Sequence, residues 1–131
     1  MSNPEVCKRL KFGEFVGVDL DGTLAEHHGW VPPGQIGAPI PLMVDRVKLW
    51  LSQGVDVRIF TARACDGGLP EGKEYVRIAT AAIREWCLEH IGQELPITCT
   101  KDWRMVEFWD DRAIQVIENT GQCVADLVSR A

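Results

Sequence analysis

The feature that most constrains this chain is a short apolar run that ends in two aspartates. Residues 15–18 are apolar or glycine, Asp19 and Asp21 follow, and Asp21 opens a Gly-Thr turn. Side chains two residues apart on an extended strand point to the same face, so we expect the two carboxylates to lie together. Like charges this close repel each other unless a cation or a proton intervenes. The segment therefore predicts a strand ending at a divalent metal site, at a carboxylate nucleophile beside a general acid, or at both.

The rest of the chain alternates strand patterns with helix patterns, which predicts an α/β fold with a mainly parallel sheet covered on both faces. We expect this three-layer arrangement to contain strands at residues 15–20, 55–61, 97–100 and 105–109. Two helices are expected, from Pro41 to about Gly54 and from about Glu74 to His90. The turn signal at 119–121 predicts short strands at 113–118 and 122–127, and a short helix at 112–118 is the alternative.

Composition narrows the class of protein. With 131 residues, the chain is predicted to form one domain, 1–131. Its five scattered cysteines include no Cys-x-x-Cys pair, and its polar start lacks the apolar centre of a signal peptide, so we expect reduced thiols and a cytoplasmic location. No apolar run is long enough for a membrane span. The net charge of −5 does not indicate a nucleic-acid surface, but it leaves a local basic patch open, and the sequence also allows a homo-oligomer.

Several polar side chains follow the expected strands. In a parallel sheet the carboxyl ends of the strands form the ligand crevice. Thr61 ends the second strand, Lys101 follows the third, and Asp110 and Asp111 follow the fourth. Together with Asp19 and Asp21, they bring two acidic pairs, a hydroxyl and a cation to one edge of the sheet.

In this order the segments resemble the four motifs of the haloacid dehalogenase superfamily, whose members are mostly magnesium-dependent phosphohydrolases. The first motif is matched by Asp19-Leu20-Asp21-Gly22-Thr23 and the second by Ile59-Phe60-Thr61-Ala62-Arg63. Lys101 is similar to the third, and Phe108-Trp109-Asp110-Asp111 to the fourth. The ordered set is far more specific than any one member.

The resemblance implies a phosphatase that acts on phosphomonoesters through an aspartyl-phosphate. Asp19 would attack phosphorus and Asp21 would act as the general acid and base. Thr61, Lys101, Gly22 and Arg63 would bind the phosphoryl group. Mg²⁺ would be held by Asp19, the Asp21 backbone carbonyl and Asp110, with Asp111 orienting these groups or binding through water.

The resemblance also implies a member without a cap domain, because the gap between the first and second motifs and the gap between the second and third each hold only a loop and one helix. The loops 26–40 and 64–73 are the local candidates for a lid. The substrate remains open: a nucleotide, a nucleic-acid end and another phosphomonoester are all compatible with the motifs. The five tryptophans are interpreted mainly as packing residues, with Trp30 and Trp103 as candidates for a substrate mouth.

Some assignments have rivals. Lys73 and Arg104 compete with Lys101 for the role of the basic residue, and Arg63 could form an ion pair instead of binding phosphate. The adjacent His27 and His28 are interpreted as loop residues. A receiver-like phosphoacceptor domain is an alternative function, although the Asp19-x-Asp21 spacing fits its order of motifs poorly. A non-catalytic metal-binding module of the same fold is another.

Overall fold

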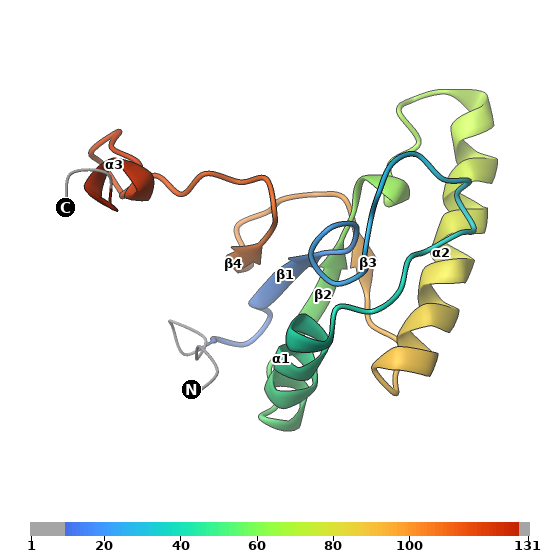
Figure 1. The fold of residues 1–131 in the computed structure, drawn as a ribbon, viewed down its shortest axis with the longest axis horizontal. Helices are drawn as coiled ribbons and strands as arrows, with labels where there is room; N and C mark the ends of the chain where they lie inside the picture. Colours follow the sequence, from blue (N-terminus) through green and yellow to red (C-terminus); the bar gives the residue numbers. More distant parts are fainter. Residues whose placement is uncertain (1–9, 129–131) are drawn as a thin grey trace.

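The computed structural model describes residues 10–128 and is built around four parallel strands in the order β3-β2-β1-β4 (Figure 1). The strands are β1 Phe15–Asp19, β2 Val57–Phe60, β3 Ile97–Thr98 and β4 Met105–Trp109. The helices are α1 Pro41–Ser52, α2 Pro70–His90 and α3 Val124–Val128, with a short 3₁₀ helix η1 at Ala62–Ala64. The predicted α/β fold with a parallel sheet and no cap domain is confirmed, and the all-parallel order of the strands makes it Rossmann-like.

The central strand β1 is shielded on both edges. Val16 pairs with Val57 of β2, and Val18 pairs with Trp109 of β4. Both valines are fully buried, which explains why the run before Asp19 is continuously apolar. Because β1 and β4 are neighbours, Asp19 and the acidic pair after β4 reach the same edge of the sheet.

Both long helices pack on one face of the sheet. A single core contains Val16 and Val18 of β1 together with buried residues of both helices, among them Val47 and Trp50 of α1 and Ile83 and Cys87 of α2. The expectation of helices on both faces is therefore wrong for α1 and α2, which form one layer over the sheet. The connection from β3 to β4, residues 99–104, contains no helix, and a crossover this short cannot carry one to the second face.

The second face of the sheet is aromatic. Alternation along the strands places Phe15 and Phe60 opposite the core valines. The Arg58 guanidinium lies 4.2 Å from the centre of the Phe15 ring, and the rings of Phe60 and Phe108 are 4.8 Å apart. Phe108 is 39% exposed, so this face keeps aromatic surface open to solvent beside the carboxyl ends of the strands.

Several element boundaries differ from those expected. Helix α2 begins at Pro70 rather than at about Glu74, because proline fits the first turn of a helix, where its missing N–H costs nothing. The prediction of two C-terminal strands is wrong, because residues 113–123 form only a single bridge, between Val116 and Cys123. The alternative prediction, a helix at 112–118, is wrong as well. The second predicted strand is instead α3, where the Asp126 carboxylate accepts a hydrogen bond from the Cys123 N–H.

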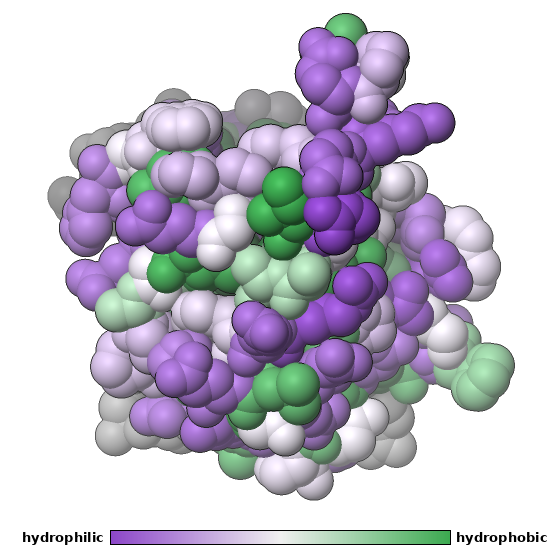
Figure 2. All heavy atoms as spheres, turned by 90° about the vertical axis from the view of Figure 1, so that its right-hand side faces the viewer, coloured by the Kyte–Doolittle hydropathy of each residue, from purple (hydrophilic) through white to green (hydrophobic). Residues whose placement is uncertain are grey.

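The face that α2 presents to solvent is mainly hydrophilic, with only isolated apolar side chains (Figure 2). Within residues 10–128, no helix is both long and apolar enough to cross a lipid bilayer. The segment after Asp111 runs away from the sheet and carries α3 to the side of the molecule opposite α2 (Figure 1). The site described next is thus formed by the sheet, its connecting loops and α2.

Replacing Trp50 with alanine should destabilise the fold strongly. Trp50 is fully buried and its ring lies 5.0 Å from that of Trp109. Loss of such a side chain lowers the free energy of unfolding by about 3–5 kcal/mol. Urea denaturation followed by circular dichroism measures this, with Leu42→Ala as control because Leu42 is 52% exposed on the same helix. Equal stability of the two variants would contradict the described core.

Candidate metal and phosphate site

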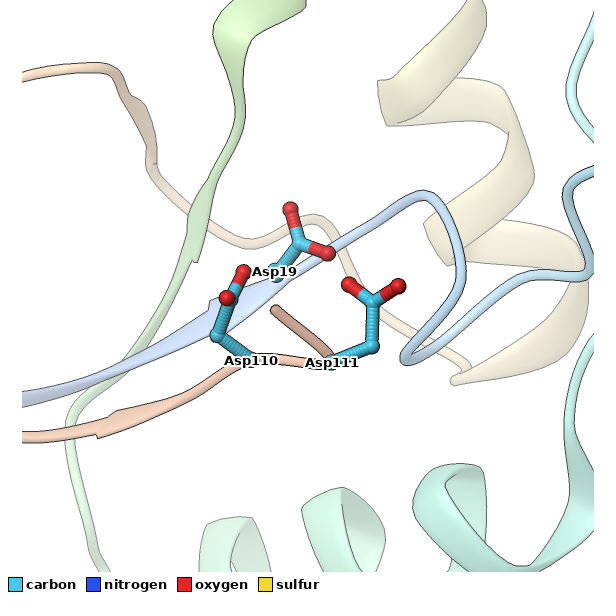
Figure 3. Close-up of side chains that lie close together, drawn as sticks. All are labelled: Asp19, Asp110 and Asp111. Atoms are coloured by element: carbon cyan, nitrogen blue, oxygen red, sulfur yellow. The ribbon is translucent and has the colours of Figure 1, made fainter. Parts of the chain in front are cut away.

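Three carboxylates meet at the carboxyl edge of the sheet. Asp19 ends β1, and Asp110 and Asp111 follow β4 directly. Each offers an oxygen that lies within 4.8 Å of those of the other two. Figure 3 shows the three side chains on the same side of the strand ends. Hard carboxylate oxygens gathered in this way are the ligands that Mg²⁺ and Ca²⁺ prefer, so the cluster could hold such an ion.

The cluster affects the ionisation of Asp19. Burial and the nearby charge of Asp110 raise the pKa of Asp19 from 3.8 to about 7, and a hydrogen bond with Asp111 acts in the same direction. The Thr23 hydroxyl donates to Asp19 Oδ2 at 3.2 Å and opposes this shift. A bound cation would favour the ionised form of Asp19 and would lower its pKa again.

The Gly-Thr turn after Asp21 is adjusted to this cluster. Gly22 has a φ of 88°, which favours glycine, and a Cβ atom there would lie only 2.5 Å from Asp111 Oδ2, so a larger residue would also force the Asp111 side chain to move. The Thr23 hydroxyl lies 3.4 Å from Asp111 Oδ1 as well as near Asp19. Sequence reasoning gave Thr23 no role of its own, although its place in the first motif was the available signal.

The loop after β4 orients Asp110. Its Oδ2 atom accepts hydrogen bonds from the backbone N–H groups of Arg112 at 2.8 Å and Ala113 at 2.7 Å. This local turn fixes the carboxylate against the end of the strand. A fixed carboxylate loses less conformational entropy when it binds a cation, which makes Asp110 a suitable ligand.

Asp21 lies beside the cluster but is held by a different partner. Arg63 donates to it through two nitrogens, Nε to Oδ2 and Nη2 to Oδ1, each at 2.8 Å. The guanidinium also donates through Nη1 to the carbonyls of Pro33 at 3.1 Å and Gln35 at 2.8 Å. The sequence left open whether Arg63 forms an ion pair or binds phosphate, and in the structure it forms an ion pair with Asp21. The contact joins the end of β2 to Asp21 and to the loop 26–40.

Of the other residues expected to bind phosphate, Thr61 lies in the cleft and Lys101 lies outside it. Thr61 is 2% exposed, lines the cleft, and accepts a hydrogen bond from the Arg63 N–H at 3.1 Å. Lys101 is exposed in the connection between β3 and β4 and does not line the cleft. Its rival Lys73 is exposed on α2, and Arg104 forms an ion pair with Asp102 at 2.8 Å. None of these three basic side chains contributes to the cleft wall as the structure stands.

A cleft of about 590 Å³ opens over the cluster. Its walls include the expected residues Asp19, Asp21, Thr61, Arg63, Asp110 and Asp111. Sequence reasoning missed Arg112, Tyr75, Phe60 and Phe108, which also line it. Arg112 follows the acidic pair directly, which was a usable signal, whereas Tyr75 reaches the cleft only through the packing of α2. Of the two tryptophans proposed for a substrate mouth, Trp30 lines the cleft and Trp103 does not.

Comparison with known proteins gives a fold relative. No protein-family model matches the chain, and no curated protein sequence matches it. A solved structure of a conserved protein coded by a locus of Bacteroides thetaiotaomicron is 25% identical, with 79% of each chain covered and a TM-score of 0.51. This similarity extends over most of the chain and supports the α/β fold.

The raised pKa of Asp19 predicts how pH acts on the metal-free protein. Between pH 4 and 7 the folded state holds a proton that the unfolded state releases, so stability falls as pH rises through this window and levels off above it. Thermal unfolding in the presence of chelator should therefore show that the stability of wild type falls with rising pH, by a few kcal/mol at most. The Asp19→Asn variant should not show this fall. Mg²⁺ should raise the melting temperature more at pH 8 than at pH 5, because its ligands are then ionised.

Asp110→Asn provides the matched comparison. It removes the charge that opposes ionisation of Asp19, so the metal-free variant should be more stable than wild type at pH 8. It should also lose most of the stabilisation by Mg²⁺. An unchanged response to Mg²⁺ in this variant would contradict the assignment of Asp110 as a ligand.

Proposed function

We propose that this protein is a magnesium-dependent phosphohydrolase of the haloacid dehalogenase superfamily, acting on phosphomonoesters through an aspartyl-phosphate. The observation that carries the proposal is the meeting of Asp19, Asp110 and Asp111 within 4.8 Å at the carboxyl ends of two adjacent strands. These are residues of the first and fourth motifs, which are far apart in the sequence. The metal-ligating set that the resemblance implies is therefore compatible with the fold.

In this proposal Asp19 is the nucleophile. One of its carboxylate oxygens attacks phosphorus, the bond to the leaving oxygen breaks, and water later hydrolyses the acyl phosphate. Mg²⁺ held by Asp19, the backbone carbonyl of Asp21 and Asp110 would screen the charge between carboxylate and phosphate. Thr23 supports the reactive carboxylate by donating to its Oδ2 atom. Asp111, beside Gly22 and Thr23, orients the turn or binds the ion through water.

Asp21 is the proposed general acid and base. It would give a proton to the leaving oxygen and later take one from the attacking water. The two hydrogen bonds from Arg63 hold its carboxylate in one orientation and away from the metal-ligating trio. Arg63 therefore acts in this proposal by positioning Asp21, in addition to any contact with phosphate.

The phosphoryl oxygens would be bound by Thr61 and by the backbone of the turn at Gly22, with positive charge from Lys101 or Arg112. Thr61 already accepts from the Arg63 N–H, so its hydroxyl proton can be donated to a phosphoryl oxygen. Arg112 lines the cleft, whereas Lys101 would have to move toward it.

Replacing Asp19 with asparagine should abolish turnover, because the amide is a poor nucleophile and a weaker metal ligand. Phosphate release from 4-nitrophenyl phosphate should depend on Mg²⁺ in wild type and fall by roughly 10³-fold or more in Asp19→Asn. The exposed Asp45 on α1 provides the control, since Asp45→Asn should keep full activity. Retained turnover in Asp19→Asn would remove Asp19 as nucleophile. A phosphorylated protein without turnover would favour the receiver-like alternative.

The proposed role of Arg63 predicts a dependence on the leaving group. A good leaving group needs little protonation, so Arg63→Met and Asp21→Asn should both slow an alkyl phosphate about tenfold more than 4-nitrophenyl phosphate. The double variant should slow the alkyl phosphate about as much as each single variant does, because both substitutions remove the same acid function. Arg77→Met on the surface of α2 is the control, and Arg63→Lys keeps the charge of a buried site if Arg63→Met folds poorly. Equal slowing of both substrates would contradict the role.

A further inference from the structure

The cleft is much larger than the reacting centre needs. The carboxylate oxygens of the trio lie within 4.8 Å of one another, whereas the cleft encloses about 590 Å³. This volume falls in the range of sites that bury a whole small molecule. The remainder of the cleft is therefore available to the part of the substrate that carries the phosphate.

Four aromatic residues line that remainder. Trp30, Phe60, Tyr75 and Phe108 all line the cleft, and they come from a loop, two strands and α2. Trp30 is 81% exposed and Phe108 is 39% exposed, so both rings are accessible to a ligand in the cleft. Exposed aromatic faces in a cleft bind planar rings by stacking, with little preference for a particular ring.

The loop that carries Trp30 is anchored from several sides. Arg63 donates to the carbonyls of Pro33 and Gln35, and Trp86 of α2 donates through its indole N–H to the carbonyl of Gly37 at 3.0 Å. A backbone hydrogen bond from Glu26 to Ala38 closes the base of the loop. The backbone of the loop that presents Trp30 is therefore held in place by its neighbours, which reduces the entropic cost of ordering this loop when a ligand binds.

A second hollow adjoins the cleft at this loop. It encloses about 260 Å³ and shares His27, Trp30, Val31 and Arg63 with the cleft. Its other lining residues include Glu26, His28 and Gln35, which carry polar side chains. Carboxylate, imidazole and amide groups can pair with the donors and acceptors on the edge of a nucleobase, whereas a plain phenyl ring offers no such edge.

We infer that the substrate is a nucleoside monophosphate, with its phosphate at the carboxylate trio, its base stacked on Trp30 and the edge of the base toward the second hollow. This inference rests on the proposed function for the phosphate end. A free mononucleotide fits better than a polynucleotide end, because the net charge of −5 gives the chain no overall positive field that would attract a long phosphate backbone.

The test compares adenosine 5′-monophosphate with ribose 5-phosphate, which has the same sugar and phosphate but no base. With Mg²⁺ present, wild type should turn over the nucleotide with a kcat/KM at least tenfold higher. Trp30→Ala should remove most of this preference. Trp103→Ala should retain it, because Trp103 is equally exposed at 81% but lies outside the cleft. Equal kcat/KM values for the two substrates, or a tenfold preference for phosphotyrosine, would overturn the inference.

A binding measurement separates this inference from the proposed reaction. Metal-free wild type is titrated calorimetrically with adenosine and with ribose, neither of which carries a phosphate. Adenosine should bind at millimolar concentrations and ribose should not; Trp30→Ala should lose the binding and Trp103→Ala should keep it. Adenosine binding without hydrolysis of any phosphomonoester would contradict the phosphatase and leave the base site standing. Hydrolysis of phosphomonoesters without adenosine binding would overturn the base site alone.

Discussion

The repulsion among three carboxylates at one edge of a parallel sheet is the constraint on which this site depends. Asp19, Asp110 and Asp111 are brought together by the pairing of β1 with β4, and the raised pKa of Asp19 reflects its own burial and the nearby charge of Asp110. A cation bound among them would favour the ionised form of Asp19. The turn at Gly22 lies against the same cluster, since a Cβ atom at this position would displace the Asp111 side chain.

Arg63 links this centre to the loop above it. Its guanidinium contacts the Asp21 carboxylate and two backbone carbonyls of the loop 26–40, and it is buried while doing so. One side chain thus sets the orientation of the proposed acid and the position of the loop that carries Trp30. In a chain without a cap domain, this contact supplies part of the enclosure that a separate domain would otherwise provide.

Much of the fold could be predicted from periodicity and from Gly and Pro signals. Helix α1 begins at Pro41 and β4 covers Met105–Trp109, as the sequence predicted. Layering could not be predicted in the same way, because the face on which a helix packs depends on strand order and on the length of the β3–β4 connection. The C-terminal strand pair failed because Asp126 and Cys123 form a local helical turn that competes with pairing.

The sequence by itself determined that carboxylates, a hydroxyl and a glycine turn would follow the strands, since these residues end short apolar runs bounded by turn signals. Tertiary structure decided which of them meet: β1 and β4 are neighbours, so Asp19 joins Asp110 and Asp111, while Asp21 turns to Arg63. It also placed Trp30 in the cleft and left Lys101 outside it. Such placements depend on strand order and loop anchoring between residues distant in sequence, which no local pattern encodes.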